Sequence, residues 1–117
     1  MIPRILHRIW FGPKMPAEFV AYGEAWRRIM PNWEHRLWTE ADVPHDLVNH
    51  EAFDQAPPGD AHRWRSDILR LEVLLRYGGV YVDADTEPLK PLDGLLDGVG
   101  CFVAWSPNRT RDGREVL

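Results

Sequence analysis

Hydrophobic and polar residues alternate with two different periods along the first forty positions. From Arg4 to Gly12 side chains alternate between two faces and end in Gly-Pro, which predicts a strand followed by a turn. Residues 15–31 place apolar side chains at helical spacing between two prolines, which predicts a helix. Residues 32–39 alternate again and predict a second short strand.

A weak helix is expected next, over residues 40–50, where Thr39 is a plausible N-cap but Pro44 interrupts the pattern. Residues 52–60 contain two prolines and a glycine and predict a loop that leads to Asp60.

The strongest helical pattern of the chain follows Asp60. Asp60 can cap this helix, and Gly78 or Gly79 can end it. Four apolar residues fall at positions i, i+4, i+7 and i+11 and predict its buried face: Trp64, Ile68, Leu71 and Leu75.

Short apolar segments and prolines dominate the rest of the sequence. Residues 80–85 predict a third strand, and the prolines within 86–98 argue against both regular helix and ladder strand. The apolar run 99–105 predicts a fourth strand, and the polar residues 106–117 a loop or tail. Strands that alternate with helices indicate an α/β fold whose mostly parallel sheet is covered on both faces. With 117 residues, we expect a single domain, residues 1–117.

Composition and charge narrow the function classes. With 44% hydrophobic and 27% charged residues the chain is expected to fold, and a net charge of -4 argues against nucleic acid as a partner. We see no run of about 20 apolar residues, as a membrane span would need, and no signal-peptide pattern, so a cytoplasmic protein is expected.

Several residue types have simple structural explanations. Most of the six tryptophans should lie in the core, because large rings stabilise a small core efficiently. Cys101 sits in an apolar run and is expected to be a small buried side chain. The five histidines show no metal-ligand spacing and are interpreted as structural or surface residues.

Two aspartates stand where the predicted third strand ends, in the segment "VYVDAD". Alternation on a strand would place Asp83 and Asp85 on the same face as Tyr81. Two like charges so close together need a compensating cation, and ligands of parallel sheets bind beyond the carboxyl ends of strands. Carboxylates there suit Mg²⁺ or Mn²⁺. Such a pair occurs often by chance, and on its own it favours a solvated turn over a metal site.

The preceding helix carries a second pair of charged residues. Asp67 and Arg70 are three positions apart, so they are neighbours on one helix face. The residues alone favour a surface salt bridge.

The segment "RSDILRLEVLLRYGGVYVDADTEPLKPLD", taken with "IPRILHRIWFGP" near the N-terminus, closely resembles a family of glycosyltransferases. It is the DXD-containing family of the sugar-binding-region type, with the yeast initiating α-1,6-mannosyltransferase, bacterial capsular and lipooligosaccharide sugar transferases and, more distantly, the clostridial glucosylating toxins. The resemblance implies a short or minimal GT-A fold, which is a Rossmann-like α/β fold. It also implies a UDP- or GDP-sugar donor, a divalent cation (Mn²⁺ or Mg²⁺) and retention of anomeric configuration.

The resemblance also implies a role for individual residues. The tryptophan of the first strand would stack against or flank the nucleobase, the Ser-Asp-x-x-Arg helix would hold sugar and ribose hydroxyls, and the tyrosine and first aspartate of the carboxylate segment would line the ribose and sugar. The second aspartate would ligate the metal, with the first beside it. These positions are Trp10; Ser66, Asp67 and Arg70; Tyr81 and Asp83; and Asp85, with Asp83 and Asp85 as the catalytic candidates.

Two functions stay open on the sequence. Members of the family are usually longer, and the part without a counterpart here normally completes the sheet and shapes the acceptor pocket. The first function is hexosyl transfer to an unidentified acceptor, for which a saccharide is expected; the second is a module that binds a nucleotide sugar and transfers nothing. A small α/β domain with surface carboxylates would leave the motif match unexplained. An exposed sheet edge would favour a homo-oligomer.

Overall fold

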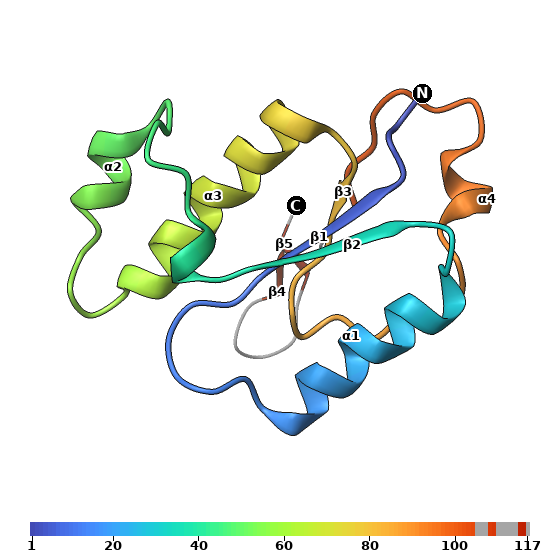
Figure 1. Cartoon of the computed structure of the whole chain (residues 1–117), viewed down its shortest axis with the longest axis horizontal. Helices are drawn as coiled ribbons and strands as arrows, with labels where there is room; N and C mark the ends of the chain where they lie inside the picture. The colour runs from blue at the N-terminus through green and yellow to red at the C-terminus, as the bar shows by residue number, and fades with distance from the viewer. Residues whose placement is uncertain (105–107, 110–114, 117) are drawn as a thin grey trace.

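Three parallel strands form the centre of the molecule. The computed structural model describes residues 1–104, 108–109 and 115–116. Within them, strands β1 (Ile5–Ile9), β2 (Glu34–Trp38) and β3 (Val80–Tyr81) form a sheet in the order β2-β1-β3. β1 pairs in parallel with both neighbours, with Leu6 opposite His35 on one side and Val80 on the other. The predicted α/β fold with a parallel sheet is confirmed (Figure 1).

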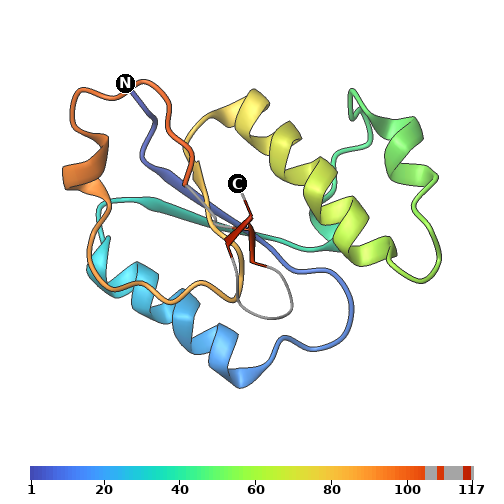
Figure 2. The ribbon, with the colours of Figure 1, turned by 180° about the vertical axis from the view of Figure 1, so that it is seen from behind.

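Helices α1 (Ala17–Ile29) and α3 (Ala61–Tyr77) cover opposite faces of this sheet, as both views of the ribbon show (Figures 1 and 2). Each interface has its own apolar cluster. Leu6 and Val80 of the sheet pack with Trp26 of α1, whereas Ile9 packs with residues of α3. The alternation along β1 therefore divides its side chains between two cores.

The two long helices start and stop close to the predicted positions. α1 follows Pro16 and ends before Pro31, and α3 follows Asp60, whose carbonyl accepts the Trp64 N–H. Gly78, with φ 66°, ends α3. At Gly79, with φ 94°, a Cβ atom would lie 2.4 Å from the carbonyl oxygen of Ile5, so only glycine lets the chain enter β3 beside β1.

The predicted buried face of α3 is wrong. Leu69 and Val73 are fully buried against the sheet, with Glu72 beside them. Leu71 is 64% exposed and Leu75 74% exposed. The predicted stripe, which contains Leu71 and Leu75, thus points away from the sheet. The path of the chain before α3 and into β3 sets the rotation of the helix about its axis, and this rotation decides which face meets the sheet.

Two short helices lie where the sequence predicts other structure. The weak helix predicted over residues 40–50 is replaced at its start by the 3₁₀ turn η1 (Glu40–Asp42), in which the Asp42 carboxylate accepts hydrogen bonds from the Thr39 N–H and hydroxyl. The helix α2 (His50–Asp54) begins inside that segment and extends into the predicted loop. The helix α4 (Asp93–Leu96) forms two residues after Pro91, where the ring no longer interferes with helical hydrogen bonds.

The predicted fourth strand is absent from residues 99–104, and Trp105 lies outside the described residues. Cys101 is exposed, contrary to prediction, and so is Val103. An apolar run becomes a strand only where another edge supplies hydrogen-bond partners, and β3 offers just two paired residues. Strands β4 (Asn108–Arg109) and β5 (Glu115–Val116) pair antiparallel with each other within the stretch predicted as loop or tail.

The tryptophans divide between core and periphery. Trp26, Trp33 and Trp38 are buried as expected, whereas Trp10 is half-buried and Trp64 exposed.

Within the described part of the chain, no helix combines the length and the apolar character needed to cross a membrane.

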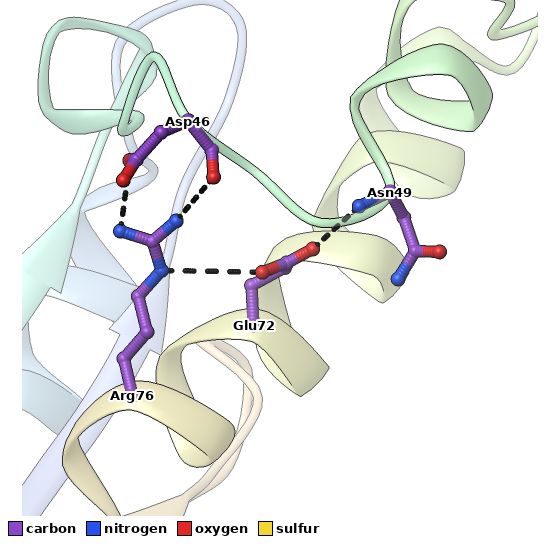
Figure 3. A network of polar contacts seen from close by, with 4 residues as sticks. All are labelled: Asp46, Asn49, Glu72 and Arg76. Carbon is purple, nitrogen blue, oxygen red and sulfur yellow. Dashed lines mark hydrogen bonds and ion pairs between the residues drawn. The ribbon is translucent and has the colours of Figure 1, made fainter.

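A polar network ties the segment after β2 to α3 (Figure 3). The buried Glu72 accepts a hydrogen bond from the Asn49 N–H at 2.8 Å. Arg76 donates to the carbonyl and the carboxylate of Asp46 at 2.8 and 3.0 Å, which lowers the pKa of Asp46. These bonds fix the loop whose Leu47 side chain completes the core under α3.

His7 is a second buried polar group, on the α3 side of β1. Its Nδ1 accepts the Trp38 indole N–H at 3.1 Å, so Nε2 carries the proton and donates to the Gly78 carbonyl at 2.9 Å. Burial lowers the pKa of this imidazole, which favours its neutral form.

Paired truncations should distinguish the two faces of α3. We expect Leu69→Ala to lower the free energy of unfolding by about 2 to 5 kcal/mol, because it leaves a cavity against the sheet. Leu71→Ala should change it by less than about 0.5 kcal/mol, because that side chain is exposed. Urea unfolding followed by circular dichroism measures both, and equal losses would mean that the face assigned here as buried is wrong.

Stability should fall as pH drops below about 6.5, the ordinary histidine pKa. The unfolded chain takes up a proton on His7 there, whereas the folded chain, with its lowered pKa, does not. The contribution is therefore complete above that pH and is lost below it, by up to about 1.4 kcal/mol per pH unit. When the free energy of unfolding is measured in urea between about pH 5 and 7.5, it should depend less steeply on pH in His7→Gln than in the wild type. The exposed His45→Gln is the control, and an unchanged slope in His7→Gln would contradict the assignment.

Candidate functional site

A cleft of about 500 Å³ opens at the carboxyl ends of β1 and β3. Its walls come from the residues after each of these strands, from the first turn of α1 and from the N-terminal half of α3. The sequence-predicted site residues all line it: Trp10, Ser66, Asp67, Arg70, Tyr81, Asp83 and Asp85. Ligands of parallel sheets characteristically bind at such a position.

The carboxylate segment is a turn and not a strand. β3 ends at Tyr81, the Val82 N–H still bonds to the His7 carbonyl at 3.0 Å, and the Thr86 N–H then closes a turn on the Asp83 carbonyl at 3.0 Å. Asp83 and Asp85 are exposed on this turn, with the buried Ala84 between them. The expected strand alternation is therefore wrong, but both aspartates line the cleft.

Asp67, Arg70 and Tyr81 form a cluster on the α3 side. Arg70 donates to the Asp67 carboxylate at 3.1 Å, and its guanidinium lies 5.4 Å from the centre of the Tyr81 ring. Burial and the neighbouring Asp83 carboxylate raise the pKa of Tyr81, so its phenol stays protonated and can donate a hydrogen bond. Because the Asp67–Arg70 pair is partly exposed, it contributes little to stability and stays accessible from the cleft.

Aromatic side chains form the opposite wall. Trp10 meets Phe19 of α1 edge to face, with ring centres 5.8 Å apart. Its indole N–H donates to the Pro13 carbonyl at 2.6 Å, which fixes the orientation of the ring. A half-buried, oriented indole at the lip of a cleft offers one face for stacking.

His62 also lines the cleft, although the sequence suggests only a structural or surface role. It is exposed in the first turn of α3, and a Cβ atom on Gly12 would lie 3.1 Å from its ring. Gly12 has φ 105°, so glycine at this position lets the loop after β1 pass close to α3.

The sequence interpretation missed Arg8, which lies beneath the cleft. It is only 8% exposed, and its Nη2 donates to the carbonyls of Phe19 at 2.9 Å and Ala84 at 3.3 Å. Burial lowers the pKa of the guanidinium. Trp26 adds a second tie, from its indole N–H to the Thr86 carbonyl at 3.2 Å. The sequence did contain a signal for this role, because Arg8 is a charged residue within a largely apolar predicted strand.

The carboxylate donors fit a hard divalent cation that keeps other ligands. Among the described residues no three His, Cys, Asp or Glu side chains gather as a metal-ligand cluster. No lysine or arginine side chain within residues 1–104 forms an ion pair with Asp83 or Asp85. Mg²⁺ and Mn²⁺ commonly take one or two protein carboxylates and complete their coordination with water and phosphate oxygens.

Residues 16–100 match the family described as "Glycosyltransferase sugar-binding region containing DXD motif". The chain belongs to this family. The matched range contains the α3 cluster and the carboxylate turn, and Trp10 precedes it. The predicted family resemblance is thereby confirmed.

Several curated relatives of the chain are named as mannosyltransferases. Inositol phosphoceramide mannosyltransferase 3 of Schizosaccharomyces pombe is 29% identical over 112 residues, covering 89% of this chain and 29% of the relative. Inositol phosphoceramide mannosyltransferase 2 of the same yeast is 31% identical, covering 82% and 28%. The initiation-specific alpha-1,6-mannosyltransferase of Candida albicans is 31% identical, covering 67% and 22%. The chain thus spans less than a third of each, and no solved structure gives a significant match.

Proposed function

We propose that the protein is a metal-dependent retaining glycosyltransferase that uses a nucleoside-diphosphate sugar. One observation carries the proposal: in a chain of this family, a single cleft combines an aromatic wall, the Asp67–Arg70 pair and two exposed carboxylates at the carboxyl ends of β1 and β3. The proposed donor lies with its nucleobase against Trp10 and its sugar near α3. Asp83 and Asp85 face the diphosphate.

Bond cleavage places negative charge on the departing diphosphate. Asp85, with Asp83 beside it, would hold Mn²⁺ or Mg²⁺, and the bound ion would stabilise that charge as a Lewis acid. Arg70 would donate hydrogen bonds to sugar and ribose hydroxyls, and Asp67 would accept hydrogen bonds from them. The protonated phenol of Tyr81 can add a donor on the ribose side.

Positive charge develops on the sugar as the donor bond breaks. A carboxylate near the sugar favours that charge, a role open to Asp67 and Asp83. Among the described residues we assign no nucleophile. Retention of configuration is therefore proposed from the family alone.

The relatives' names guide the choice of donor and acceptor. The three relatives share a mannosyl group in their names, so GDP-mannose is the first donor to test, with UDP-sugars beside it. Two of them name inositol phosphoceramide. We propose an acceptor with hydroxyl groups of the saccharide or inositol kind.

A module that binds a nucleotide sugar without transferring it is the second candidate. It is supported by the location of the described site residues, which are all proposed for the donor side. The single domain, the homo-oligomer, the cytoplasmic location and the absence of a nucleic-acid partner stay predictions.

Donor binding should depend on both the metal and Asp85. By calorimetry with GDP-mannose and UDP-glucose, we expect Mn²⁺ to raise the affinity for the donor by about tenfold or more. The reason is that the ion offsets the repulsion between the negative diphosphate and the aspartates. Asp85→Asn should abolish most of this gain. Asp97→Asn removes the same charge outside the cleft and is the matched control. Binding that is absent throughout, or indifferent to Mn²⁺ and Asp85, would refute the metal-dependent donor site.

Slow donor hydrolysis should separate an enzyme from a binding module. A competent transferase transfers its sugar to water at a low rate, so free nucleoside diphosphate should accumulate when the wild type is incubated with its tightest-binding donor and Mn²⁺. Asp85→Asn should reduce that rate to the background of donor with Mn²⁺ alone. Tight binding with no release above background would support the module.

A further inference from the structure

We propose that Arg8 is a positioning residue of the donor cleft, which sets the separation between its aromatic wall and its carboxylate turn. The proposal rests on the function proposed above. Arg8 itself does not line the cleft; it acts through two backbone carbonyls beneath it.

A single guanidinium nitrogen connects the two walls. Nη2 carries two hydrogens and donates to Phe19, whose ring packs on Trp10, and to Ala84, which stands between the two aspartates. The carbonyls belong to residues 65 positions apart in the sequence, in α1 and in the turn after β3. Within the described residues, no other side chain donates hydrogen bonds to both walls.

The surroundings of Arg8 are unfavourable for a merely structural residue. Its Nε is buried with no hydrogen-bond partner, and no carboxylate among the described side chains forms an ion pair with it. A buried charge without a counterion is costly, and an apolar side chain of similar size would fill this position at lower cost. The two carbonyl contacts are therefore what this residue supplies.

Gly23 of α1 makes room for the guanidinium. A Cβ atom there would lie 2.2 Å from Nη1 of Arg8, so any larger residue must displace the arginine. Gly23 lies outside the set of residues that line the cleft. A substitution at Gly23 thus tests Arg8 without altering a cleft side chain or removing a charge.

The decisive comparison uses Gly23→Ala, Arg8→Lys and Arg8→Met, with Gly94→Ala as the control. Gly94 also lies in a helix, and a Cβ atom there has no neighbour within 4 Å. Two quantities are measured in each variant: the exchange rate of the Thr86 amide, which closes the carboxylate turn, and the affinity for GDP and UDP with and without Mn²⁺. Circular dichroism and cooperative unfolding confirm that each variant folds.

Gly23→Ala and Arg8→Met should speed Thr86 exchange and reduce Mn²⁺-dependent diphosphate affinity by about tenfold or more, since small misplacements of ligating groups are costly. Arg8→Lys should retain part of both, because an ammonium has donors but lacks the planar fork. Gly94→Ala should match the wild type. If Arg8→Met fails to fold, the other two variants still decide.

Wild-type affinity in Gly23→Ala and Arg8→Lys would overturn the proposal, whether or not Thr86 exchange changes. Failure of the proposed function has a different signature, because then the wild type itself shows no Mn²⁺-dependent diphosphate binding. In that case Thr86 exchange still reports whether Arg8 holds the turn. An unchanged exchange rate in all variants would refute even that.

Discussion

Parallel hydrogen bonding of β1 on both of its edges is the constraint on which the rest of the structure depends. As the middle strand it fixes β2 and β3 in one register, and its alternating side chains are divided between α1 and α3. Because both neighbours run in the same direction, the carboxyl ends of β1 and β3 meet at one edge. The cleft is a consequence of that direction, since it forms where the chain leaves these two strands.

Much of this arrangement follows from patterns that the sequence displays directly. Two-residue alternation located β1 and β2, prolines and glycines bounded α1 and α3, and the spacing of Asp67 from Arg70 placed both on one helix face. The cleft residues were found through family motifs, because each motif is a short continuous segment: one lies at the end of β1, one within α3 and one at the end of β3. The site residues that lie within short continuous motifs could therefore be predicted from the sequence.

Features that depend on tertiary packing could not be predicted from the sequence. The predicted stripe of α3 holds four apolar residues, more than the buried apolar pair Leu69 and Val73, and only the path of the chain decides that this pair faces the sheet. The run 99–105 has the composition of a strand, but β3 pairs through two residues only. Arg8 looked like an ordinary polar position of an alternating strand, since its partners lie far away in the sequence.

The shortness of β3 raises the question of how two paired residues can position a site. Adjacent polar side chains of β1 provide the answer. His7 points to the α3 side and binds the Gly78 carbonyl just before β3, and Arg8 points to the α1 side and binds the Ala84 carbonyl just after it. The strand is thus held at both ends, from both faces of the sheet, by side chains of its neighbour. Burying these two polar groups is costly without such partners, so a displaced β3 would lose ladder bonds and leave both groups unsatisfied. This coupling explains why a two-residue strand can present the Asp83–Asp85 turn in a defined place.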